Sequence, residues 1–170
     1  MKHQKTLKLI AACALSISAS GLFAHGNEGH DGAKPAAVKK EQKEWGVAGD
    51  AKSVTRTVTL TMDDNMRFTP DKLAFKQGET VRFVIRNQGK LRHEMVIGTR
   101  QDLEAHAAMM AKFPTMEHDE PYMAHVAAGK QQDLVWTFNR AGEFDFACLI
   151  AGHFQAGMVG KISVTARASQ

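Results

Sequence analysis

Three side chains that bind soft metal ions follow one another closely near the C-terminal end of the chain. Cys148, His153 and Met158 are separated by four residues at each step, so a thiol, an imidazole and a thioether share one short segment. Soft sulfur ligands favour Cu(I), imidazole binds both oxidation states, and a trigonal His₂Cys set with a weak axial methionine suits copper. His93 is the candidate for the second imidazole, because it follows a turn at residues 87–89 and begins a short apolar stretch.

Each of these four residues also has an ordinary structural explanation when it is taken singly. Cys148 could be a buried core thiol, Met158 a core side chain and His153 a surface residue. Their occurrence together, in order and on one segment, favours a metal site over these separate explanations.

The side chains need a rigid frame, and from Val54 onward the chain has the pattern of short β-strands. Apolar and polar residues alternate in several stretches that are separated by turns. These stretches lie at about residues 54–62, 73–75, 81–85, 95–97, 134–138, 144–146 and 159–164. Such spacing predicts an all-β sandwich or barrel. The ends of strands at one pole would then bring His93 to the loop at 148–158.

One segment breaks this rhythm and predicts a helix from Gln101 to Lys112. Thr99 and Asp102 have the spacing of an N-terminal capping box, and Pro114 ends the helix. The residues that share one helical face are Leu103, His106, Ala107 and Met110.

Residues 1–24 have the form of a secretory signal peptide. Three lysines precede the apolar segment Leu9–Ala24, which is too short and too interrupted by Ser and Gly to span a bilayer. We expect cleavage after Ala24, with a cut after Ser20 as the alternative. The stretch Ile10–Cys13 is similar to a lipoprotein box, which is a further alternative. The peptide predicts export to the periplasm.

Removal of this leader changes the charge and the cysteine count. The chain of 170 residues has a net charge of +4, which falls to about +1 when the three leader lysines are lost. A nearly neutral domain gives no support to a nucleic-acid partner. Cys13 leaves with the leader, so Cys148 is unpaired in an oxidising compartment. A metal ligand or a buried, inert thiol would explain it.

The segment 25–52 is polar, with several glycines and a run of charges. We expect a flexible arm, with a short helix from Pro35 to Trp45 as an alternative local structure. If cleavage follows Ala24, the amine and imidazole of His25 can chelate Cu(II), with His30 nearby. A cut after Ser20 removes that hypothesis. The folded domain is expected over residues 53–167.

From about residue 57 to residue 164 the sequence resembles the cupredoxins, the type 1 copper proteins. The matching features are Phe144-Asp-Phe-Ala-Cys148, the Cys-x₄-His-x₄-Met loop and the upstream Asn-x-Gly-x₃-His. The segments 66–70 and 76–83 are similar to exported cupredoxins of bacterial copper-handling systems. The resemblance implies a Greek-key β-sandwich and one type 1 copper, with His93, Cys148, His153 and Met158 as its ligands.

The sequence departs from this family's pattern near the ligands. Glu94 stands where many electron-carrying cupredoxins have an Asn that ties the ligand loops together, and a carboxylate there can shift the potential or the pH response. Arg92 stands where some relatives have Gly. Ala147 and Leu149 flank Cys148, where multicopper oxidases have histidines, so oxidase and nitrite reductase activities are not expected.

Histidine and methionine are concentrated in an insertion over about residues 99–128. Thioethers and imidazoles suit Cu(I), so a second, weaker copper site is one interpretation. We favour a second interpretation, in which Met109 or Met110 packs the helix on the sandwich and the histidines are exposed. In a third, a Met-rich flap covers the copper site and meets a partner. The residues concerned are His106, Met109, Met110, Met116, His118, Met123 and His125.

Two functions fit these features. The first is a one-electron carrier that docks a redox partner through the edge of His153, among Leu149, Ile150 and Phe154. The second is a copper-tolerance protein that sequesters or delivers exported copper. No nucleophile–base pair, phosphate loop or paired-acid motif points to an enzyme. We expect a monomer without a stable membrane span, whose partners are redox or copper-handling proteins.

Overall fold

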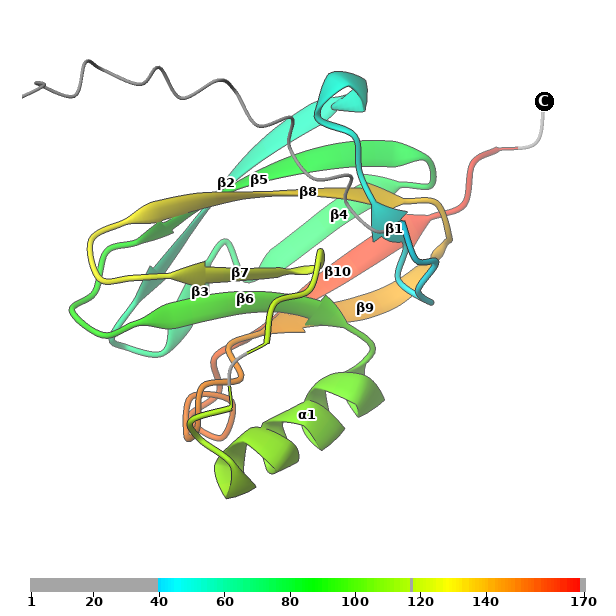
Figure 1. Cartoon of the computed structure of the whole chain (residues 1–170). Helices are drawn as coiled ribbons and strands as arrows, with labels where there is room; N and C mark the ends of the chain where they lie inside the picture. The colour runs from blue at the N-terminus through cyan, green and yellow to red at the C-terminus, as the bar shows by residue number, and fades with distance from the viewer. Residues whose placement is uncertain (1–39, 117, 169–170) are drawn as a thin grey trace, which may run out of the picture. The chain divides into compact units, whose positions relative to one another are not determined.

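Two β-sheets form most of the part of the chain that the structure describes (Figure 1). The structure is a computed structural model, and it describes residues 40–116 and 118–168. Its elements are β1 (Val47–Ala48), the 3₁₀ turn η1 (Ala51–Ser53), β2 (Arg56–Asp63), β3 (Arg67–Thr69), β4 (Lys72–Lys76), β5 (Glu79–Asn87), β6 (His93–Gly98), α1 (Arg100–Lys112), β7 (Met123–Val126), β8 (Gln131–Phe138), β9 (Gly142–Ala147) and β10 (Val159–Thr165).

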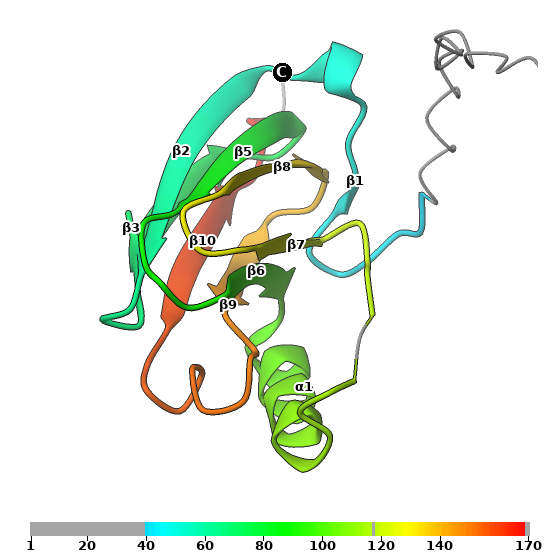
Figure 2. The same ribbon diagram turned by 60° about the vertical axis from the view of Figure 1, so that its left-hand side comes forward.

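The two sheets face each other as layers, with β2, β5 and β8 opposite β6, β9 and β10 (Figure 2). The first sheet has the strand order β1-β8-β5-β2-β3 and the second β4-β10-β9-β6-β7. β2 runs parallel to β5 and β4 to β10, whereas the other neighbours are antiparallel. The all-β, Greek-key sandwich with one helical insertion is therefore confirmed.

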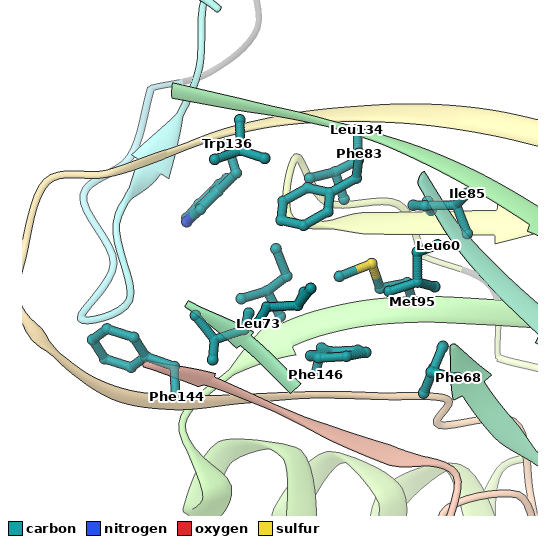
Figure 3. Close-up of a cluster of buried hydrophobic side chains, with 14 of the residues drawn as sticks. Leu60, Phe68, Leu73, Phe83, Ile85, Met95, Leu134, Trp136, Phe144 and Phe146 are labelled. Carbon is teal, nitrogen blue, oxygen red and sulfur yellow. The ribbon is translucent and has the colours of Figure 1, made fainter. Parts of the chain in front are cut away.

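Alternate residues of the strands fill the space between the sheets (Figure 3). Val81, Phe83 and Ile85 on β5 are fully buried, as the period of two along a strand requires. Phe75 stacks on Phe138 with ring centroids 4.7 Å apart. Each large apolar side chain buried in this way contributes about 1.5–3 kcal/mol, which makes the frame rigid.

Strand β6 is buried along its whole length because both of its faces are covered. Met95 and Ile97 belong to the core between the sheets, whereas Val96 belongs to a second cluster beneath α1. The alternation of side chains therefore assigns His93 to the core face and Glu94 to the face under the insertion. The residues of α1 in the second cluster are Leu103, Ala107 and Met110.

The helix predicted at 101–112 is present as α1. Thr99 is its N-cap, and the Thr99 hydroxyl accepts a hydrogen bond of 3.1 Å from the backbone N–H of Asp102. This contact satisfies one of the N–H groups that the first turn leaves free. The buried face predicted from the sequence, apart from the half-buried His106, packs on β6 and β9.

The segment before η1 differs from the predicted arm. Trp45 is buried in the core, and the Trp136 indole donates a 2.9 Å hydrogen bond to the carbonyl of Trp45. β1 pairs with β8, and Lys43 and Gly46 form an isolated bridge in place of helix. Burial of a large indole outweighs the polar composition of the segment. The packed domain therefore begins before residue 53.

The predicted signal peptide at 1–24, with His25 and His30 of the predicted arm, lies outside the described residues. Within residues 40–116 and 118–168, no helix combines the length and the hydrophobicity needed to cross a bilayer.

Candidate metal centre

Two neighbouring strands bring the central residues of the site to one end of the sandwich. His93 begins β6, and Cys148 directly follows the last residue of β9. These strands are antiparallel neighbours, so the beginning of one lies beside the end of the other. His93 lies two residues before Met95 and Cys148 two residues after Phe146, so each points to the same face of its strand as that core residue. Both side chains therefore point into the sandwich and are fully buried.

Backbone hydrogen bonds fold the loop at 148–158 back on itself. The N–H of Met158 donates to the carbonyl of His153, and the N–H of Cys148 donates to the carbonyl of Met158, both at 3.1 Å. Gly152 and Gly157 have φ values of 90° and 89°, which glycine adopts at low cost. The loop thus presents His153 over the strand ends and sets the backbone of Met158 next to that of Cys148.

The ligand atoms of His93, Cys148 and His153 all lie within 4.8 Å of one another. Cys148 Sγ is 3.3 Å from His153 Nδ1, and the two imidazole rings have centroids 4.9 Å apart. The structure therefore brings together the two histidines and the cysteine that the sequence singled out. Met158 is fully buried at the base of the same loop. Its thioether as an axial ligand stays a prediction.

The hydrogen bonding of His93 leaves one nitrogen for a metal. Nε2 lies 3.1 Å from Asp64 Oδ1, whereas Nδ1 is buried without a hydrogen-bond partner among the described residues. A buried polar atom left in this state costs about 1–3 kcal/mol. A carboxylate on the far nitrogen is the usual way to orient a ligating imidazole. The donor set and this unpartnered nitrogen fit a copper ion.

Asp64 was not identified from the sequence. Its carboxylate also accepts the backbone N–H groups of Lys90 and Leu91, at 2.8 and 3.2 Å. The hydrogen bond from Lys90 has the larger effect, and together with that from Leu91 it holds the pKa of Asp64 below its usual range. A Cβ at Gly89 would overlap the carboxylate. The only sequence signal was a polar turn after β2, which does not indicate a partner on another loop.

The protonation of the site also suits metal binding. Burial raises the pKa of the Cys148 thiol to about 12, so the metal-free chain keeps a neutral thiol that a metal ion would have to deprotonate. Burial, and then the neighbouring His93, lower the pKa of His153. Its imidazole is therefore neutral at neutral pH and can act as a ligand.

Glu94 links the ligand strands on the face opposite His93. Its Oε1 accepts a hydrogen bond of 2.9 Å from the backbone N–H of Leu149, and its Oε2 lies 2.9 Å from His125 Nδ1. The contact between the Glu94 carboxylate and the ring of His125 is the main cause that raises the pKa of His125. The carboxylate thus connects the strand of His93 to the residue after Cys148, the role that the family resemblance gives to Asn at this position.

The insertion meets the site across an open cavity of about 770 Å³. His153 and Glu94 line it from the sandwich. The methionines and histidines of the insertion that line it are Met110, Met116, His118 and His125, and Pro114, Thr115 and Asp119 line it as well. His106 packs against His118 with ring centroids 4.6 Å apart.

The other insertion methionines lie elsewhere. Met109 is 39% exposed, and Met123 is buried beneath α1. The favoured interpretation is therefore right for Met110, which packs the helix on the sandwich. It is wrong for the histidines, since His106, His118 and His125 are half-buried.

The prediction that Leu149 belongs to the docking surface is wrong. Leu149 is 1% exposed and packs beneath α1, because it has the parity of Ala147 and points away from His153. Ile150 and Phe154 are half-buried beside His153, and Leu91 at the cavity rim is 48% exposed.

A two-sheet sandwich whose strand ends bring a cysteine and two histidines together defines the cupredoxin class of copper proteins, as the resemblance predicted. The family model described as copper binding proteins, plastocyanin/azurin family, matches residues 54–165. The chain belongs to this family and is a copper-binding protein.

Curated relatives extend the similarity along the chain. The copper-resistant cuproprotein CopI of Rubrivivax gelatinosus is 42% identical over 161 residues, which cover 94% of this chain and 98% of the relative. The protein of the same name from Pseudomonas aeruginosa is 33% identical and covers 78% of this chain and 89% of its own length.

Solved structures share the fold. Auracyanin B superposes with a TM-score of 0.59 at 22% identity, covering 71% of this chain and 94% of its own. The reduced auracyanin of Roseiflexus castenholzii gives a TM-score of 0.56 at 18% identity, covering 66% and 98% of the two chains. At these identities the likeness concerns the fold alone.

Proposed function

We propose that this chain is an exported, periplasmic type 1 copper protein that carries one electron, with His93, Cys148, His153 and Met158 as its copper ligands. The observation that carries the proposal is the convergence of His93, Cys148 and His153 within 4.8 Å, with the buried Nδ1 of His93 left without a partner. Copper bound there supplies one-electron chemistry by alternating between Cu(I) and Cu(II).

The chain contributes rigidity to this function. Asp64 holds the ring of His93 from one loop, while Glu94 holds the backbone beyond Cys148 from β6. Both ligand strands lie inside a packed sandwich. A frame that holds its ligands in one geometry changes little when the charge of the site changes.

Docking of a redox partner would involve the half-buried ring of His153. Ile150 and Phe154 flank it, and Leu91 extends the apolar surface along the cavity rim. Such a small apolar surface suits a brief encounter rather than a stable complex. The proposal assigns no catalytic reaction to the chain.

Titration of the mature chain with Cu(II), followed by visible spectroscopy, tests the proposal. We expect an intense visible band, with one copper ion per chain in the site that gives this colour. Cys148→Ser should abolish the band because it removes the thiolate. His106→Gln is the matched control, since His106 lies outside the cluster and its loss should leave the band unchanged. A colourless wild-type chain would contradict the proposal.

A second function, copper tolerance, is favoured by two observations. The curated relatives are copper-resistant cuproproteins, and further histidines and methionines surround the cavity beside the site. We propose that the same copper-binding chain limits periplasmic copper by holding or passing it on. Deletion of the gene should then reduce growth on copper, and the wild-type gene should restore it. Normal growth of the deletion strain on copper would exclude this role.

A further inference from the structure

A second group of soft donors lies on the opposite face of β6 and β7 from the proposed type 1 site. His93 points into the sandwich, whereas Glu94 and His125 point to the outer face beneath the insertion. Helix α1 covers this outer face and lies below β6 in the view of Figure 2. His106 on α1 and His118 on the segment that joins α1 to β7 bring their rings together there.

The two rings of this pair have free nitrogens. Nε2 of His106 and both Nδ1 and Nε2 of His118 are buried, and none has a hydrogen-bond partner among the described residues. Buried polar atoms are nearly always paired in folded proteins, so three free nitrogens on two rings in contact call for a ligand. A metal ion bound between the two imidazoles would take one nitrogen from each ring.

The third histidine is already engaged. His125 Nδ1 pairs with Glu94 Oε2 at 2.9 Å, and its Nε2 lies 3.0 Å from the carbonyl of His118. His125 therefore anchors the backbone of His118. Its Nδ1 makes no hydrogen bond of good geometry, but it faces the Glu94 carboxylate in an ion pair and not the rings of His106 and His118. The structure separates the three histidines of the insertion into two candidate ligands and one positioning residue.

A thioether completes the donor set. Met110 lies one helical turn after His106, so the two side chains share a face of α1. Met110 is 7% exposed and lines the cavity together with His118. Met116 lines it too, but it is 38% exposed and lies at the rim.

We propose that His106 and His118, together with Met110, form a second metal site that binds Cu(I). The donors are neutral imidazoles and a thioether, a set that suits the soft, univalent cuprous ion. The Glu94 carboxylate is occupied by Leu149 and His125. The site has no cysteine, so it adds no thiolate colour. It binds copper independently of the electron-carrier function, which uses the separate ligand set His93, Cys148, His153 and Met158.

Competition with the Cu(I) chelator bicinchoninate, on the full mature chain under reducing and anaerobic conditions, tests the site. We expect His106→Gln/His118→Gln to bind one Cu(I) fewer than the wild type. His25 and His30 are present in both chains, so copper held by the arm cancels in the comparison. Equal numbers of Cu(I) bound with equal affinity by the two chains would overturn the inference.

Substitution of Met110 or Met109 by leucine tests the thioether with little effect on folding. Loss of an outer partner of a metal site already weakens binding about 10–100-fold, so Met110→Leu should weaken the second Cu(I) by at least about tenfold. Met109→Leu, one residue earlier on α1 and exposed, should leave it unchanged. Equal affinities in these two variants would contradict a role for the thioether.

Two further measurements separate this inference from the proposed function. Addition of Ag(I), a redox-inert mimic of Cu(I), should shift the ring ¹⁵N resonances of His106 and His118 but not those of His125. Absence of shifts at His106 and His118 would overturn the site. Retention of the Cu(II) visible band in His106→Gln/His118→Gln would show that this variant is folded. A missing band in the wild type would refute the type 1 assignment, while the Cu(I) count would still decide the second site.

Discussion

Glu94 Oε1 accepts a 2.9 Å hydrogen bond from the backbone N–H of Leu149, and this contact joins β6 to the loop that contains Cys148. Both partners are buried, so the bond is shielded from water. It runs across the strand pair on the face opposite His93. One carboxylate therefore supports the proposed type 1 site from behind and, through His125, the segment that contains His118.

Removal of this carboxylate should destabilise the fold. Glu94→Ala leaves the buried N–H of Leu149 without an acceptor, which costs about 1–3 kcal/mol. Urea unfolding of the metal-free chain measures the loss. Glu104→Ala removes an exposed carboxylate that pairs with Arg100 and should change stability by less than about 1 kcal/mol. Equal stability of the two variants would show that the Glu94 bond contributes little.

Asp64 should affect copper binding rather than folding. Asp64→Ala removes the group that orients His93, so we expect copper affinity to fall about 10–100-fold, as measured by competition with a chelator. Asp71→Ala is the matched control, since Asp71 is exposed and does not belong to the cluster of ligand residues. If both variants bind copper as tightly as the wild type, Asp64 does not orient the ligand.

Cys148 of the metal-free chain should react slowly with iodoacetamide at pH 8. Its thiol is buried and has a pKa of about 12 instead of 9.0, which lowers the thiolate fraction about a thousandfold. Unfolding in guanidinium should restore fast labelling, measured by mass spectrometry. Rapid labelling of the folded chain would mean that the loop at 148–158 opens readily.

The same thiol sets an alkaline limit on the metal-free fold. Because folding raises this pKa, the unfolded chain loses the proton first, and the stabilisation present below pH 9.0 is lost as the pH rises toward about 12. Cys148→Ser removes the thiol, so the free energy of unfolding of this variant should fall less steeply with rising pH than that of the wild type. Parallel profiles for the two chains would contradict the assignment to Cys148.

Gly46 should prove essential for the order of the segment before β2. A Cβ there would overlap the carbonyl oxygen of Thr137, and φ is 130°. Gly46→Ala should therefore detach β1 and destabilise the domain by more than about 1 kcal/mol. Gly78→Ala is the control, because Gly78 also has a positive φ but faces open space. A smaller loss in Gly46→Ala than in this control would show that the overlap is relieved at no cost.

The amino-acid sequence by itself determined the longer strands, the capped helix and the order of the candidate ligands, but it did not predict β1, β3 and β7. Alternation along residues 81–85 and the spacing from Cys148 to Met158 are properties of neighbouring residues, so they persist whatever the rest of the chain does. The parity of β6 and β9 then leaves one arrangement in which His93 and Cys148 face the same interior.

Only the tertiary structure decided which distant groups meet. Asp64 reaches His93 because two loops close at one end of the sandwich, and Trp45 is buried because β8 offers it an edge and a core. His106 and His118 meet because α1 returns over β6. Such contacts depend on how loops close and sheets pack, and neither composition nor local periodicity contains that information.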